Sequence, residues 1–214
     1  MRWIRSYLAA ARGHFARAER DARAVLRSAV EPSLRARAAV TLGSILRQTD
    51  RHAEARAVES ATLRRTSTPA LRAHLLVGLA ADAVGLGDLR AVDRRLEQAG
   101  ALRVRDPRLT IRLRWVRCER ELLAGRPERA ARWARSAVAA SRRVGARRHL
   151  AKSLLFLGAS RLETVRRAEG ATSARAAVEA RSSLREARAT AERLGAGPIA
   201  RVAGELLGRA AAAR

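Results

Sequence analysis

Apolar residues recur every three or four positions along most of this chain, and the stretch from Leu34 to Arg65 shows the pattern most clearly. Its first half forms one apolar stripe of a helix with 3.6 residues per turn. The stripe consists of Leu34, Ala38, Thr41, Leu42, Ile45 and Leu46. Polar residues at 48–50 interrupt it, and Asp50 is suited to cap a second helix. In that helix Ala55, Val58 or Glu59, and Thr62 face inward. We therefore predict two helices folded back on each other.

The same arrangement returns along the chain. Inward positions of the second helices are Ala18, Ala55, Val92, Ala130 and Ala180, at intervals of 37, 37, 38 and 50 residues. The long last interval predicts that the fifth hairpin has helices extended by roughly three turns. A hairpin of this length cannot bury its apolar stripe alone, so it must stack against its neighbours.

The interval pattern predicts an all-α protein and a single domain, 1–214, made of about five hairpins. Their expected boundaries are 2–30, 32–66, 69–100, 107–144 and 146–195, followed by a capping helix at 198–212. In the fourth hairpin two registers stay open. Either Trp115, Cys118 and Leu122 form the inward stripe, or Arg114 and Arg117 occupy it.

The second hairpin resembles the tetratricopeptide repeat (TPR). Ala39, Leu42, Gly43 and Leu46 match its first helix, and Ala55 and Thr62 match part of its second. Gly43 and Ala55 are small where two backbones would approach closely, whereas Glu59 stands where the family has an aromatic or aliphatic residue. The resemblance implies a right-handed α-solenoid of stacked antiparallel helix hairpins. The repeat length is similar to that of actinobacterial stand-alone TPR arrays and of the TPR portions of large LuxR/MalT-type regulators.

In that family, ligands lie along the concave surface formed by the first helix of each pair. The matching positions here are Arg37, Ser44, Arg47, His74, Val77, Arg112, Trp115, Glu119, Lys152 and Leu155. Their cationic members favour an acidic peptide or an acidic partner protein. The alternative is that Trp115 belongs to the core and the arginines only face solvent.

Charge adds a second hypothesis. The chain has 45 basic and 20 acidic residues, a net charge of +25, and Lys152 is its only lysine. The stretch 108–148 carries 13 basic and three acidic residues. A surface for sequence-independent nucleic-acid binding would consist of Arg129, Arg132, Arg135, Arg142, Arg143, Arg147 and Arg148. The alternative is that GC-rich coding favours arginine and that these residues merely solvate helix faces.

Other functions find little support in the sequence. The four histidines are scattered without metal-ligand spacing, and Cys118 lies on an apolar stripe as a small buried hydrophobe is expected to. We therefore expect a non-enzyme without catalytic residues, metal or cofactor. The sequence contains no apolar run long enough for a membrane-spanning helix. Its single cysteine excludes an internal disulfide bond. A cytoplasmic location is the expectation.

Overall fold

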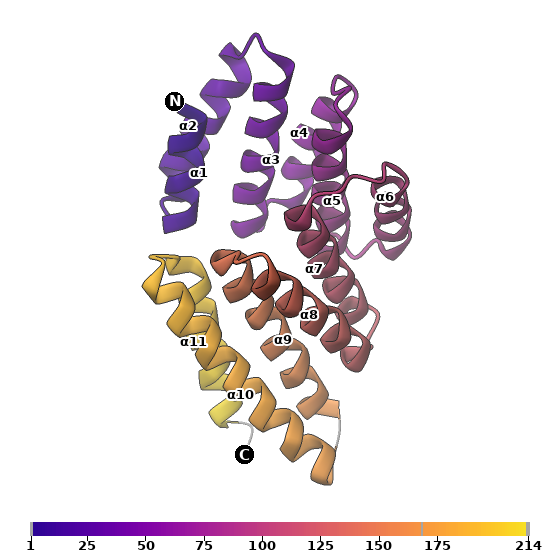
Figure 1. Cartoon of the computed structure of the whole chain (residues 1–214), viewed down its shortest axis with the longest axis vertical. Helices are drawn as coiled ribbons and strands as arrows, with labels where there is room; N and C mark the ends of the chain where they lie inside the picture. The colour runs from indigo at the N-terminus through magenta and orange to yellow at the C-terminus, as the bar shows by residue number, and fades with distance from the viewer. Residues whose placement is uncertain (1, 168, 213–214) are drawn as a thin grey trace. The chain divides into compact units, whose positions relative to one another are not determined.

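The computed structural model describes residues 2–167 and 169–212, and within these ranges every regular element is an α-helix (Figure 1). The first half contains α1 (Arg2–Arg12), α2 (Phe15–Ser28), α3 (Pro32–Gln48), α4 (His52–Leu63), α5 (Pro69–Gly85) and α6 (Leu89–Ala101). The second half contains α7 (Pro107–Leu123), α8 (Pro127–Arg143), α9 (Arg147–Arg167), α10 (Gly170–Arg193) and α11 (Gly197–Ala212). The predicted all-α class, with five hairpins and a closing helix, is confirmed.

The chain divides into two compact units, unit 1 (Met1–Leu109) and unit 2 (Thr110–Arg214). In unit 1, each helix from α1 to α6 packs against the next one along the chain. The first helices α1, α3 and α5 also contact one another in that order. The hairpin α3–α4 is therefore flanked on both sides by its sequence neighbours, as an α-solenoid requires. The expectation of one continuous domain stays a prediction.

In unit 2, α8 packs on α9, α9 on α10, and α11 covers both α10 and α9. The α7–α8 contact is formed by Ile111 and Trp115 against small residues of α8. Trp115 and Cys118 are buried, whereas Arg114 and Arg117 are only half-buried. The apolar register of the fourth hairpin is therefore the correct one of the two alternatives.

The turns inside the first four hairpins repeat with the predicted period. Each turn contains one residue with a left-handed backbone, namely Gly13, Asp50, Gly87 or Gly125. The intervals of 37, 37 and 38 residues match those of the buried alanine or valine five residues later. In every case the next N–H donates to the carbonyl five residues before it, at 2.8 to 2.9 Å. This is the Schellman arrangement that ends helices.

Asp50 does not cap α4 as the sequence predicted. Its φ of 60° makes it the left-handed residue that ends α3, and Arg51 precedes the first residue of α4 without a side-chain capping bond. The expected long fifth hairpin is present, because α9 has 21 residues and α10 has 24, compared with 17 each in α7 and α8. In the described part of the chain, no helix combines the length and hydrophobicity needed to cross a bilayer.

Candidate functional site

In unit 1, Arg37 and Ser44 lie exposed on α3, where the sequence predicted a binding surface. The guanidinium carbon of Arg37 lies 5.6 Å from the centroid of the Trp3 ring in α1. The Trp3 indole N–H donates to the Thr41 hydroxyl at 3.0 Å, and this hydroxyl donates to the carbonyl of Arg37. Trp3 therefore joins α1 to α3, and it supports the part of α3 that carries Arg37.

Arg47 lies in the interior instead of on an open surface, since its side chain is only 13% exposed. Its two terminal nitrogens donate to the two carboxylate oxygens of Glu59 in α4, at 3.0 and 3.1 Å. One of them also donates to Asp82 in α5 at 3.1 Å and to the carbonyl of Gly78 at 3.2 Å. Both carboxylate side chains are fully buried. The expected ligand-binding role of Arg47 is therefore replaced by a link among α3, α4 and α5.

Two glycines provide the space for this cluster. A Cβ atom built on Gly43 or on Gly78 would collide with the carboxylate of Glu59. The sequence predicted that Gly43 permits a close approach of two backbones. Its actual neighbour is the charged side chain that replaces the usual apolar residue of the repeat.

The charges of the cluster change each other's protonation. Burial opposes the charge of Arg47, but the carboxylates of Glu59 and Asp82 outweigh it and raise the pKa of Arg47 above its ordinary value. Burial raises the pKa of Asp82, and Arg47 offsets this only in part. His52 lies beside the cluster, with Nδ1 3.7 Å from a carboxylate oxygen of Asp82. We call Arg47, Glu59 and Asp82 the buried ion cluster.

His74 and Val77, the candidates on α5, are also engaged within the protein. His74 Nε2 lies 3.1 Å from Oδ2 of Asp106, in the segment between α6 and α7. The other carboxylate oxygen of Asp106 accepts the backbone N–H of Arg108 at 2.8 Å. Burial opposes the charge of Asp106, but these donors lower its pKa. Val77 is 1% exposed and offers no surface to a ligand.

In unit 2, Trp115 is the centre of a cluster that joins α7 to α9. Its indole N–H donates to the Ser153 hydroxyl at 2.8 Å, and the His149 ring stacks on it with centroids 5.2 Å apart. The ammonium of Lys152 lies 4.9 Å from the Trp115 centroid and 5.5 Å from that of Phe156. We call Trp115, His149, Lys152 and Phe156 the aromatic–lysine cluster.

Trp115 and Lys152 were among the residues predicted from the sequence, whereas His149 and Phe156 were not. The missed signal is helical spacing, because residues three and four apart along α9 share one face. Among the remaining candidates, Arg112 and Glu119 are half-buried on α7. Leu155 packs against the core residues of α10 and α11 and therefore belongs to the interior.

The arginines of α8 differ in whether a carboxylate lies near them. Arg142 donates to both carboxylate oxygens of Glu186 in α10, at 2.9 and 3.1 Å. Burial opposes the charge of Glu179 in α10, but Arg175 and Arg161, which both pair with it, lower its pKa, and the charge of Arg135 adds a smaller effect. Arg129, Arg132 and Arg143, in contrast, lie exposed on α8 without an acidic partner among the described residues. Arg147 is exposed at the start of α9, and Arg148 is half-buried.

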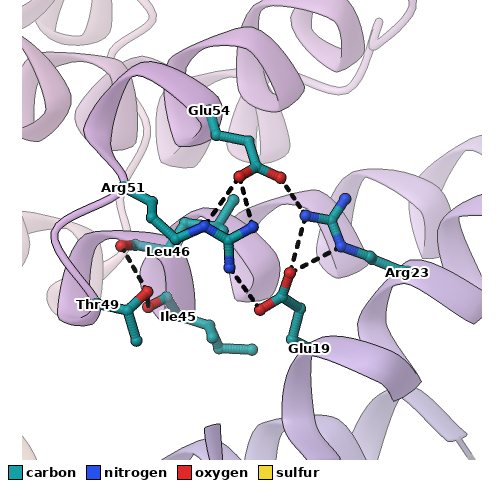
Figure 2. A network of polar contacts seen from close by, with 7 residues as sticks. All are labelled: Glu19, Arg23, Ile45, Leu46, Thr49, Arg51 and Glu54. Atoms are coloured by element: carbon teal, nitrogen blue, oxygen red, sulfur yellow. Dashed lines mark hydrogen bonds and ion pairs between the residues drawn. The ribbon is translucent and has the colours of Figure 1, made fainter. Parts of the chain in front are cut away.

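Unit 1 shows that other arginines of this chain are neutralised within the fold. Figure 2 shows Glu19 and Arg23 of α2 with Arg51 and Glu54 at the start of α4. Arg51 bonds Glu19 at 2.8 Å and Glu54 at 2.9 Å, and Arg23 contacts both carboxylates as well. Hydrogen bonding from Arg23 lowers the pKa of Glu54. This closed ring of alternating charges joins the second helices of the first two hairpins.

The one thiol is unsuited to nucleophilic chemistry at neutral pH. Cys118 is fully buried with its sulfur 3.3 Å from the Ser160 hydroxyl, and burial raises its pKa to about 12. Because the thiolate is the reactive form, this side chain is a packing residue. Across residues 2–167 and 169–212, no group of three or more histidine, cysteine or carboxylate side chains is arranged to hold a metal ion.

Comparison with known proteins identifies solved structures that are similar to this chain. No protein family and no curated protein matches the sequence. Among solved structures, the chain is similar to the Rap protein complexed with Competence and Sporulation Factor, with a TM-score of 0.65 at 9% identity. That match covers 100% of this chain and 76% of the Rap chain. It is also similar to BtubC (BKLC) from P. vanneervenii, with a TM-score of 0.51 at 13% identity over 97% of this chain and 91% of the other.

These likenesses agree with the helix packing inside each unit. The protein has a TPR-like helical-repeat fold, an α-solenoid of antiparallel helix hairpins. The expected relation to actinobacterial arrays and LuxR/MalT-type regulators stays a prediction.

Proposed function

We propose that this protein is a non-catalytic scaffold that binds an acidic segment of a partner protein along the first helices of its hairpins. The aromatic–lysine cluster of unit 2 is the centre of the proposed site, and the single observation that carries it is the position of Lys152. Its ammonium lies over two aromatic rings on α7 and α9, the first helices of adjacent hairpins. The Rap protein, which shares the fold, was crystallised with a bound factor.

Several features of the cluster suit an acidic segment. The half-buried ring of Phe156 supplies contact area at a low cost in conformational entropy, and the buried ring of Trp115 supports the ammonium of Lys152. The hydrogen bond from Trp115 to Ser153 holds the indole in place before any ligand arrives. An ammonium group then forms a charge-assisted hydrogen bond with a carboxylate of the ligand. In unit 1, Arg37 and Ser44 offer a smaller exposed surface of the same kind on α3.

A peptide panel tests the proposal. Fluorescence anisotropy would measure the affinity of the full chain for labelled peptides of equal length that differ in net charge. We expect acidic peptides to bind and Lys152→Glu to weaken them by about tenfold or more, because a hydrogen bond between charged groups is replaced by repulsion. The matched control is Arg185→Glu on α10, an exposed arginine of a second helix, which should change affinity less than about twofold.

The same measurement separates the outcomes. An equal loss with Lys152→Glu and Arg185→Glu would show that overall charge, and not the cluster, determines binding. Affinity that does not depend on peptide charge would contradict the acidic character of the partner.

We also infer a second candidate function, electrostatic binding of nucleic acid by unit 2. The observation that favours it is the exposure of arginines along α8, of which only some face carboxylates of α10. A salt titration of nucleic-acid binding tests it, since affinity that derives from phosphate contacts falls steeply with ionic strength.

A further inference from the structure

Five arginines on α7 and α8 form one continuous basic surface in unit 2. On α8, Arg129, Arg132 and Arg143 follow a spacing of 3 and 11 residues that keeps them on one side of the helix, with Ser136 and Ala139 between them. On α7, Arg114 donates to the carbonyl of Ser136 at 2.9 Å. Arg117 lies over the Trp133 ring at 4.7 Å. We call Arg114, Arg117, Arg129, Arg132 and Arg143 the α7–α8 arginine strip.

The strip concentrates positive charge without compensation. Among the described residues, none of its five guanidinium groups forms an ion pair. Burial lowers the pKa of Arg114, and the charges of Arg143 and Arg117 lower it further. The positive charges of these arginines repel one another, and an anion bound between them would relieve the repulsion.

The neighbouring stripe of the same helix shows how this chain neutralises arginines elsewhere. On this stripe Arg142 donates to both carboxylate oxygens of Glu186 in α10. The charge of Arg135, seven residues before Arg142, is felt more weakly by Glu179, whose ion-pair partners are Arg161 and Arg175. A carboxylate of α10 thus neutralises one arginine of this stripe. The α7–α8 arginine strip has no carboxylate within ion-pair distance in the described part of the chain.

The side chains between the arginines indicate the class of ligand. A protein partner binds chiefly through buried apolar and aromatic anchors. From Arg129 to Arg143, the exposed residues are arginines and Ala139, and the ring of Trp133 is covered by Arg117 and by the core around Cys118. A nucleic acid needs no apolar anchor, because phosphate contacts and counterion release supply its affinity.

We propose that the α7–α8 arginine strip binds the phosphate backbone of a nucleic acid without reading its sequence. This inference rests on the second proposed function, and it assigns that function to one side of α8. From Arg129 to Arg143 the strip extends about 21 Å along the helix. The ligand is recognised by its regularly spaced phosphates, whether it is duplex DNA or single-stranded RNA.

Two double variants of α8 provide a matched test. Arg132→Gln with Arg143→Gln removes two charges from the strip, and Arg135→Gln with Arg142→Gln removes two from the neighbouring stripe. Both variants lower the net charge equally, and circular dichroism would confirm that both keep their helix content. The probes are a labelled 20-base-pair DNA duplex and a single-stranded RNA of the same length, each titrated by anisotropy across salt concentrations.

We expect the strip variant to bind about tenfold more weakly and to lower the slope of log K against log salt by about 1 to 2, because each lost phosphate contact contributes about 0.9 for duplex DNA and 0.7 for single strands. The variant of the neighbouring stripe, Arg135→Gln with Arg142→Gln, should keep an affinity close to that of the unmodified protein. The affinities for the two probes at equal salt show whether duplex or single strand is the better ligand.

The outcomes separate the inference from the function on which it rests. If the unmodified protein binds neither probe at physiological salt, nucleic-acid binding itself is wrong. If it binds but the two double variants lose the same affinity, the function stands and the assignment to the strip is wrong. Competition by poly-glutamate as strong as competition by unlabelled nucleic acid would overturn the nucleic-acid assignment in favour of an acidic protein.

Discussion

The two terminal nitrogens of Arg47 donate to the two carboxylate oxygens of Glu59, at 3.0 and 3.1 Å, in the interior of unit 1. Arg47 belongs to α3 and Glu59 to α4, and Asp82 of α5 shares the same guanidinium. A buried ion pair is weak evidence for stability, because desolvation opposes the attraction of the charges. Removing one of the two charged groups is costly, because the remaining charge stays buried without a partner.

Replacing Arg47 tests this asymmetry. Arg47→Met leaves two buried carboxylates facing each other, and we expect the free energy of unfolding to fall by about 3–5 kcal/mol in urea titrations. The triple variant Arg47→Met, Glu59→Leu, Asp82→Ala removes all three charges and should recover most of this loss. A decrease below about 1 kcal/mol for Arg47→Met would contradict the buried position of the cluster.

Gly43 should tolerate no side chain while Glu59 is present. A Cβ at Gly43 collides with the Glu59 carboxylate, so Gly43→Ala should lower the free energy of unfolding by about 1–3 kcal/mol. The control is Gly208→Ala in α11, where a Cβ meets no neighbour within 4 Å. That change should raise stability by about 0.5–1 kcal/mol, because alanine favours a helix more than glycine does. Effects of the same sign at both positions would contradict this account.

Asp50 is a non-glycine residue at a turn position where three other hairpins have glycine. A left-handed backbone is strained for a residue with a Cβ. Asp50→Gly should therefore raise the free energy of unfolding by up to about 1 kcal/mol, measured as the urea midpoint at constant m-value. Asp88→Ala should act in the opposite direction by about 1 kcal/mol, because the Asp88 carboxylate accepts the N–H of Ala91 at the start of α6. Destabilisation by Asp50→Gly would show that the carboxylate has a role beyond the turn.

Asp82 and Asp106 should give opposite pH dependences. Because the pKa of Asp106 is lowered below 3.8, its ionised form stabilises the fold above that pH, and the contribution disappears as pH falls through the folded-state pKa. Because the pKa of Asp82 is raised above 3.8, the fold binds this proton more tightly than the unfolded chain. Stability from Asp82 therefore decreases as pH rises from 3.8 through its folded-state pKa.

Urea titrations of two variants between pH 3 and pH 7 check these signs. The destabilisation caused by Asp106→Asn should shrink as pH falls below about 4. The difference between the unmodified protein and Asp82→Asn should instead shift in favour of the unmodified protein on acidification. Parallel curves for the two variants would be inconsistent with their different surroundings.

Helix content and repeat period were predictable because both depend on local spacing. Ala18, Ala55, Val92 and Ala130 occupy equivalent buried positions, and the left-handed turn residues recur with the same intervals. Asp50 was the exception, because aspartate favours both a helix cap and a left-handed turn. The choice between these depended on where α3 ended.

The binding residues were less predictable. Arg37 and Arg47 are both arginines of α3 at expected groove positions, yet one is exposed and the other is held between α4 and α5. No local pattern distinguishes them, because the carboxylates that bind Arg47 lie 12 and 35 residues further along the chain. Likewise, Glu186 of α10 pairs with Arg142 of α8, 44 residues earlier in the chain, only after the hairpins have stacked.

The sequence by itself determined the class of fold and the length of the repeat, because an apolar stripe and a turn each involve residues a few positions apart. The tertiary structure decided which charges are neutralised and which stay exposed. The physical reason is that an ion pair depends on distance in space, and only hairpin packing brings side chains of different helices within that distance.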